Sequence, residues 1–247
     1  MKGILAVVGL TAGAAVIGIA SQSPNLTKAG EYQTPVSGRQ ADQRHNAFLA
    51  LKKLRGKVIQ PGQTFSFNQA VGTWSRDQGY RRAPVSFNGT LIDAWGGGVC
   101  QTSTTLYNAA LLAGLEIVER HSHRFSPSYV APGRDAAVAF PNIDLRFKNT
   151  LDYPITIEGE MQADILVVRL VGRGKAPIRP EIRTKILKKT EPLNLTLGTG
   201  SVGRVRSPGK PGWEVETYRE TPDGRELVSR DSYPVMQRVV ERRESVE

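Results

Sequence analysis

Cysteine is almost absent from this chain of 247 residues, which contains only Cys100. A single cysteine excludes an intramolecular disulfide and any zinc site made from paired cysteines, so the fold must depend on its hydrophobic core. Histidine occurs three times. A zinc ion bound by Cys100, His121 and His123 would still need a fourth ligand or a water, and we therefore expect neither a metal nor a cofactor.

Acidic residues are also scarce, with 23 against 33 basic residues and a formal net charge of +10. This balance suits an anionic partner, such as nucleic acid, a membrane surface or an acidic wall polymer. Aromatic residues make up only 7% of the chain, and it contains no familiar nucleic-acid-binding motif. We therefore expect anionic wall polymers or a membrane as partners, and no nucleic acid.

A long stretch without charge follows the basic start Met1-Lys2 and extends from Gly3 to Ala20. We interpret residues 1–22 as a signal peptide or membrane anchor, because small residues at 18–20 suit a signal peptidase and the stretch is long enough to span a bilayer. Cleavage and retention both remain open. The expected location is outside the cell, on the outer face of the membrane or in the cell wall. Residues 23–37 are polar, contain Pro24 and Pro35, and are interpreted as a linker.

The remaining pattern predicts an α+β fold, in which a helix carrying Cys100 at its N-terminus packs on a mostly antiparallel sheet. An earlier helix is expected at 39–54, with Ala47, Phe48, Leu51 and Leu54 on its apolar face. A hairpin is expected at 85–92, with Asn88-Gly89 as its turn. Further strands are expected at 64–67, 115–118, 136–140 and 144–148. The apolar segments 154–159 and 165–172 look like one hairpin, and 214–219 and 225–229 flank the turn Pro222-Asp223-Gly224 of another. Residues 38–172 would form the main domain, and residues 173–247 a small β-rich module.

Cys100 follows three consecutive glycines, Gly96-Gly97-Gly98, and precedes a helical pattern that Gly114 can end. The apolar residues of that pattern recur at the spacing of one helix face, at 106, 109, 110 and 113. The N-terminus of a helix favours a thiolate over a thiol, and its free N–H groups can hold an oxyanion. Glycines without side chains would let a substrate backbone approach closely. The alternative is that Cys100 is a small buried apolar residue.

His121 and His123 are two positions apart, so on a strand they would share a face, and one imidazole would lie beside the thiol. The pattern does not choose between them, and a solvated basic patch with Arg120 and Arg124 is the alternative. Asp135 would orient the imidazole as the third member of a triad. Arg134 would bind a substrate carboxylate, unless it pairs with Asp135 in the turn.

Several of these motifs together resemble the VanW family. They are residues 60–68, 79–80 and 123, the run Gly-Gly-Gly-Val-Cys-Gln-Thr-Ser-Thr-Thr-Leu-Tyr-Asn at 96–108, and Gly-Arg-Asp-Ala at 133–136. The resemblance covers about residues 38–172, and residues 208–234 resemble more weakly the G5-like segment that often follows. It implies work on a bacterial cell envelope, since the family takes its name from glycopeptide-resistance clusters. Some members are L,D-transpeptidases that cross-link peptidoglycan through the cysteine that matches Cys100.

The resemblance favours His123 over His121 as the base, although Arg124 stands where the family tends to have serine. We therefore expect a cysteine-dependent acyl transfer on peptidoglycan stem peptides, with Cys100, His123 and Asp135 as catalytic residues. The expected substrate-binding residues are Gly97, Gly98, Gln101, Ser103, Arg134 and His121. A non-catalytic wall-binding module and a cysteine peptidoglycan hydrolase remain as alternatives.

Overall fold

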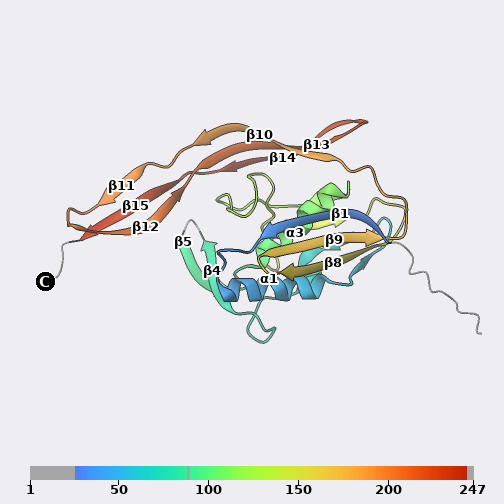
Figure 1. Cartoon of the computed structure of the whole chain (residues 1–247), viewed down its shortest axis with the longest axis horizontal. Helices are drawn as coiled ribbons and strands as arrows, with labels where there is room; N and C mark the ends of the chain where they lie inside the picture. The colour runs from blue at the N-terminus through green and yellow to red at the C-terminus, as the bar shows by residue number, and fades with distance from the viewer. Residues whose placement is uncertain (1–25, 88–89, 244–247) are drawn as a thin grey trace, which may run out of the picture.

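The computed structural model describes residues 26–87 and 90–243 and has the expected α+β architecture (Figure 1). Its elements are β1 (Thr27–Pro35), α1 (Ala41–Leu54), β2 (Val58–Ile59), β3 (Thr64–Ser66), α2 (Phe67–Val71), β4 (Arg82–Phe87), β5 (Thr90–Trp95), α3 (Val99–Leu112), β6 (Glu116–Glu119), β7 (Arg146–Lys148), β8 (Ile155–Gln162), β9 (Ile165–Gly172), β10 (Glu181–Thr190), β11 (Asn194–Leu197), β12 (Val202–Lys210), β13 (Gly212–Thr221), β14 (Gly224–Tyr233) and β15 (Met236–Arg243). The expected signal or anchor at 1–22 and the turn Asn88-Gly89 lie outside the described residues. Among the described helices, none has the length and apolar character needed to cross a membrane.

The main sheet has the strand order β1-β9-β8-β2, and its neighbouring strands are all antiparallel. The hairpin expected from the two apolar segments is present as β8 and β9. Residues 27–35, which we expected within a linker, instead form the edge strand β1 along the whole of β9. Its buried positions include Ala29, Gly30 and Thr34, which are small or polar. The linker interpretation was wrong there because such a strand lacks the alternation of large apolar residues that predicts one.

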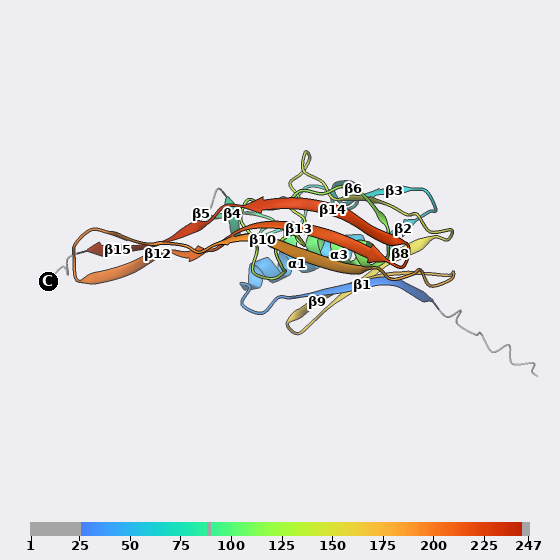
Figure 2. The same cartoon turned by 90° about the horizontal axis from the view of Figure 1, so that it is seen from above.

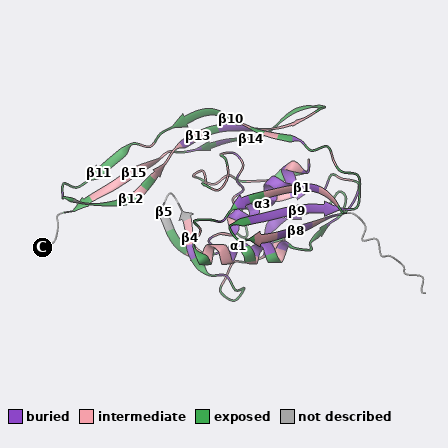
Figure 3. Ribbon diagram, in the orientation of Figure 1, coloured by how far each residue is buried: buried purple, intermediate pink, exposed green. Residues whose placement is uncertain are grey.

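The helix that follows Cys100, α3, lies at the centre of the core and packs against β1, β9 and α1. All residues from Gln101 to Leu111 are buried, and the buried residues gather on α3, β8 and β9 in Figure 3. We expected one buried apolar face on this helix, but its buried residues lie on all of its sides. Gly30 lets β1 approach closely, because a Cβ atom there would lie 2.2 Å from the carbonyl oxygen of Ala109. Gly114 ends the helix with φ of 73°, as expected.

The helix α1 matches the expected range but faces the core differently. Phe48, expected on the apolar face, is 42% exposed, while the polar Asn46 is buried. Asn46 donates to the carbonyl oxygens of Arg81 and Gly97, each at 2.9 Å, and accepts from the N–H of Arg81 at 2.8 Å. A buried polar side chain can thus occupy a core position when its hydrogen bonds are satisfied. A search of the sequence for apolar residues alone does not find such a position.

A smaller antiparallel sheet, β3-β7-β6, lies beside the core, and β4 and β5 form the expected hairpin. The strand expected at 136–140 is absent from the described part of the chain. That segment makes only two isolated bridges, His121 with Ala137 and Ala139 with Ile143. The apolar residues Ala136 and Val138 are nevertheless buried. Their alternation reflects packing under a loop rather than pairing in a sheet.

The chain after β9 forms two further sheets, β10-β13-β14 and β11-β15-β12. The first lies across the main domain on the side of α3 and β1, and the second extends beyond it (Figures 1 and 2). The hairpin expected around the turn at 222–224 is present as β13 and β14. Because the first sheet packs over the main domain, residues of the C-terminal part can reach the region of Cys100.

Candidate active site

Cys100 is the second residue of α3 and is half-buried, as the only cysteine of the chain. The residue before the helix, Gly98, has φ of 113°. The N–H groups of Val99 and Gln101 donate to the carbonyl oxygens of Gly96 and Gly98, both at 3.0 Å. The expectation that Cys100 lies in the first turn of a helix is therefore confirmed, and the helix dipole points its positive end at the sulfur.

The glycines before Cys100 are required by packing within the protein. A Cβ atom on Gly98 would lie 2.1 Å from the carbonyl oxygen of Gln43, and one on Gly97 would lie 2.7 Å from that of Ala83. The loop formed by residues 96–98 therefore packs directly against the backbone of α1 and β4. We had expected these glycines to make room for substrate, but the structure gives them a role in holding the loop that leads to Cys100.

We expect Gly98→Ala to lower the free energy of unfolding by about 3 kcal/mol, because it combines a left-handed backbone with a backbone clash. Gly38→Ala is the matched control, since Gly38 has φ of 74° and open space where the Cβ would be. Gly38→Ala should lower the free energy of unfolding by only about 1–2 kcal/mol, which is the cost of placing alanine in a left-handed backbone conformation. Urea denaturation measures both values. Equal losses in the two variants would contradict the argument from close packing.

His123 and Asp135 complete a cysteine–histidine–aspartate arrangement with Cys100. The imidazole of His123 lies near enough to the Cys100 thiol to lower its pKa. Its Nδ1 lies 2.6 Å from Oδ2 of Asp135, and the same oxygen accepts the backbone N–H of His123 at 2.7 Å. With Nδ1 held by Asp135, Nε2 is the ring nitrogen left for the sulfur. The three residues that the sequence suggested as catalytic therefore lie together.

The charges of the triad stabilise one another. Burial by itself raises the pKa of the Cys100 thiol, but the hydrogen bond and charge of His123 outweigh it, and the pKa is lowered. Burial alone would lower the pKa of His123, yet its hydrogen bonds to Asp135 and Cys100 raise it to about 10. The pKa of Asp135 is lowered, because His123 and the charge of Arg120 outweigh burial. The arrangement favours a thiolate beside an imidazolium.

His121 takes no part in this triad. Its side chain is 46% exposed, and its Nε2 lies 3.0 Å from Oε1 of Glu119. Its backbone carbonyl accepts the N–H of Ala137 at 2.8 Å, which helps to hold the segment whose Val138 carbonyl lies 3.4 Å from Sγ of Cys100. Of the two histidines, His123 is therefore the one that lies beside Cys100 and Asp135. We had also expected His121 to contact substrate, but its side chain points to Glu119 instead.

Gln101 and Ser103, also expected to bind substrate, are buried and bonded within the protein. The Gln101 amide donates to the carbonyl oxygen of Pro35 at 2.7 Å and to the Thr34 hydroxyl at 3.1 Å. The Ser103 hydroxyl lies 2.6 Å from the carbonyl oxygen of Ala136. These side chains instead fasten α3 to β1 and to the segment after Asp135.

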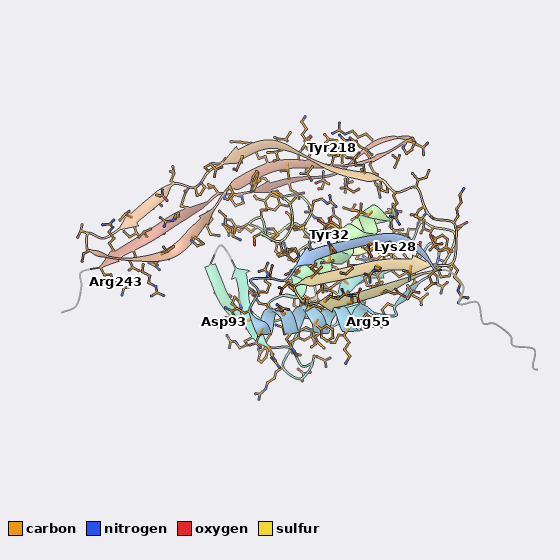
Figure 4. All side chains as sticks on the ribbon, viewed as in Figure 1. Lys28, Tyr32, Arg55, Asp93, Tyr218 and Arg243 are labelled. Carbon is orange, nitrogen blue, oxygen red and sulfur yellow. The ribbon has the colours of Figure 1, made fainter. Side chains whose placement is uncertain are left out.

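Arg134 was expected either to bind a substrate carboxylate or to pair with Asp135, and its side chain instead contacts other residues of the protein. Its Nε donates to Oδ1 of Asn108 at 2.6 Å, and its guanidinium lies over the Tyr32 ring at 5.6 Å. Tyr32 is labelled in Figure 4, where it lies on β1 beneath the C-terminal sheet. Arg134 therefore links the turn before Asp135 to α3 and β1.

Sequence reasoning missed the residues that surround Asp135. Arg120, which belonged to the solvated basic patch weighed as the alternative, has a side chain only 7% exposed and pairs with both Asp135 and Asp231. Tyr233 is also buried and donates its hydroxyl to Oδ1 of Asp135 at 2.5 Å. The two partners from β14 are about 100 residues away in sequence. No local signal could have found them, because the docking of the C-terminal sheet brings them there.

Tyr129 is another neighbour that the sequence did not indicate. Its hydroxyl lies 3.5 Å from the Cys100 carbonyl oxygen, and the Arg39 guanidinium lies 4.8 Å from the centre of its ring. Within residues 26–87 and 90–243, no group of three or more histidine, cysteine or acidic side chains is arranged to bind a metal ion.

Comparisons with known proteins agree on one family. Residues 42–171 match the family described as VanW like protein. The chain is 42% identical to the uncharacterized protein YoaR of Bacillus subtilis over 141 residues, covering 57% of this chain and 46% of that protein. It is 29% identical over 178 residues to the vancomycin B-type resistance protein VanW of Enterococcus faecalis, covering 64% and 63%. The chain thus spans less than two thirds of the length of either relative. No solved structure matches it.

Proposed function

The chain belongs to the VanW family, and from its cysteine site we propose that it is an exported cell-envelope protein that transfers acyl groups of peptidoglycan stem peptides through Cys100. One observation carries the proposal. A cysteine at the start of a helix has its pKa lowered by a neighbouring imidazole, and Nδ1 of that imidazole is held by a buried carboxylate. This is the arrangement that activates a nucleophile in acyl transfer.

In the first half-reaction, the Cys100 thiolate attacks the carbonyl carbon of a stem-peptide amide, between a diamino acid and a terminal D-Ala. The His123 imidazolium gives its proton to the leaving amine as the C–N bond breaks, which leaves a thioester on Cys100. Within the described residues the N–H of Cys100 has no acceptor, so it supports this step as an oxyanion donor at the head of α3.

In the second half-reaction, an amine from a neighbouring stem peptide attacks the thioester. His123, now neutral, takes the proton from this amine, and a new amide forms as the thiolate is released. The sulfur and the imidazole thereby return to their starting charge states. If water takes the place of the amine, the same residues give hydrolysis.

Substrate carboxylates would meet arginines outside the triad, because Arg134 is engaged inside the protein. Arg76, Arg81 and Arg82 line a cavity of about 480 Å³ together with Trp95, the residue directly before the glycine loop. Arg81 pairs with Asp42 at 2.9 Å, so the lining keeps an excess of positive charge. This excess supports an anionic substrate. The relative named for vancomycin resistance supports work on the cell envelope.

The decisive experiment is the intact mass of the purified chain after incubation with a tetrapeptide-bearing muropeptide. We expect a covalent adduct on Cys100 with the mass of the muropeptide acyl group, without the terminal D-Ala. Added acceptor muropeptide should then give a cross-linked dimer, whereas only shortened peptide would indicate a hydrolase. No adduct, slow alkylation of Cys100 at pH 7 and salt-sensitive wall binding would instead indicate a non-catalytic wall-binding module.

A further inference from the structure

Asp231 and Tyr233, two buried residues of β14, reach the support of the triad from the C-terminal sheet. The Tyr233 hydroxyl donates to Oδ1 of Asp135 at 2.5 Å and accepts the backbone N–H of Gly133 at 2.9 Å. Both residues lie beyond residues 42–171, the part of the chain that matches the family.

The Asp135 carboxylate is held from both sides. Its Oδ2 accepts two hydrogen bonds from His123, through the backbone N–H and through Nδ1. Its Oδ1 accepts from Tyr233 and, at 3.1 Å, from Arg120. Arg120 is in turn fixed by its pairing with Asp231. Two of the four donors to Asp135 therefore depend directly on residues of the C-terminal sheet.

The turn that carries Asp135 is held by the same sheet. The Thr217 hydroxyl of β13 donates to the Gly133 carbonyl oxygen at 3.2 Å. The approach is so close that a Cβ atom on Gly133 would lie 2.5 Å from this hydroxyl oxygen. The backbone next to Asp135 is thus positioned by β13 and β14 rather than by the main domain alone.

We propose that the C-terminal sheet is a working part of the reactive site, in which Tyr233, and Asp231 through Arg120, are positioning residues that align Asp135 and His123 on Cys100. The inference rests on the proposed function for its chemistry. Without the Tyr233 hydroxyl, the carboxylate loses one of its two Oδ1 donors and can rotate away from the imidazole. The aligned thiolate–imidazolium pair is then less populated, and the apparent pKa of the thiol rises.

The test is the pH profile of Cys100 alkylation by iodoacetamide in the purified full chain, where the only cysteine reports on one site. We expect Tyr233→Phe to raise the apparent thiol pKa by about half a unit or more, which is about a threefold loss of thiolate on the acid side. Tyr218→Phe is the matched control. Tyr218, labelled in Figure 4, lies on β13 of the same sheet, and its hydroxyl donates to Glu216 at 2.6 Å rather than to Asp135. Its profile should superpose on that of the parent.

Thr217→Val is a second variant that removes another hydrogen bond from the sheet to the turn, and it should shift the profile in the same direction. Thermal unfolding establishes that each variant is folded. If the parent has a lowered thiol pKa and neither folded variant changes it, this inference is overturned and the proposed function remains intact. A parent thiol that titrates like free cysteine would remove the thiolate–imidazolium pair, and both proposals with it.

Discussion

Cys100→Ala is expected to reduce stem-peptide transfer by at least about 10⁴-fold and to abolish the covalent adduct, because the variant has no atom that can form the thioester. The side chain that is lost is small and half-buried, so the fold should survive. Transfer is measured by chromatography of cross-linked muropeptides, and adduct formation by intact mass. Alanine also leaves the rest of the site in place for substrate binding.

Cys100→Ser is the matched control for shape. The hydroxyl fits where the thiol was, but its pKa is far higher, and His123 does not ionise it. We expect transfer to remain lost by about 10³-fold or more. Transfer at the parent rate in either variant would show that the sulfur is not the nucleophile, and the geometry around it would then be explained by packing alone.

His123→Gln is expected to lower transfer at pH 7 by about 10²- to 10³-fold and to move the acid limb of the pH–rate profile to higher pH. In the parent, the reactive thiolate is present above the lowered pKa of Cys100, and the proton donor is present below the pKa of His123, about 10. The parent profile should therefore be bell-shaped, with its alkaline limb near pH 10. Without the imidazolium, burial still disfavours the thiolate, so the thiol pKa rises.

His121→Gln is the matched control, because it makes the same change two residues away on an exposed side chain that hydrogen-bonds to Glu119. Its rate and profile should equal those of the parent. The measurement is initial transfer rate from pH 5 to 11, together with iodoacetamide alkylation, which follows the thiolate without substrate. Equal losses in the two variants, or an unmoved acid limb in His123→Gln, would contradict the assignment of the base.

The sequence by itself determined the position of the nucleophile and the type of its surroundings. Three glycines, one cysteine and a helical pattern ended by Gly114 are all local signals, and the structure places Cys100 in the first turn of α3 as they predict. The hairpins formed by β8 with β9 and by β13 with β14 were also predictable, because each is coded by adjacent strands and a turn.

The sequence did not predict which polar residues are buried. Gln101 and Ser103 lie beside Cys100 in the sequence and were expected to face substrate, yet both are bonded inside the core. The strand β1 was missed for a related reason, since its buried side is made of small and polar residues. Such positions are stabilised by particular hydrogen-bond partners, and those partners are known only after the chain has folded.

Only the tertiary structure decided which imidazole serves Cys100 and what holds Asp135. The spacing of His121 and His123 does not distinguish them. The Asp135 carboxylate does, because it hydrogen-bonds to the backbone N–H and to Nδ1 of His123. Asp135 in turn owes its position to Arg120 and to Tyr233, which is 98 residues further along the chain. Contacts between residues so far apart in the sequence form only when the C-terminal sheet docks on α3 and on the turn at Gly133. Local secondary-structure propensity does not predict that docking.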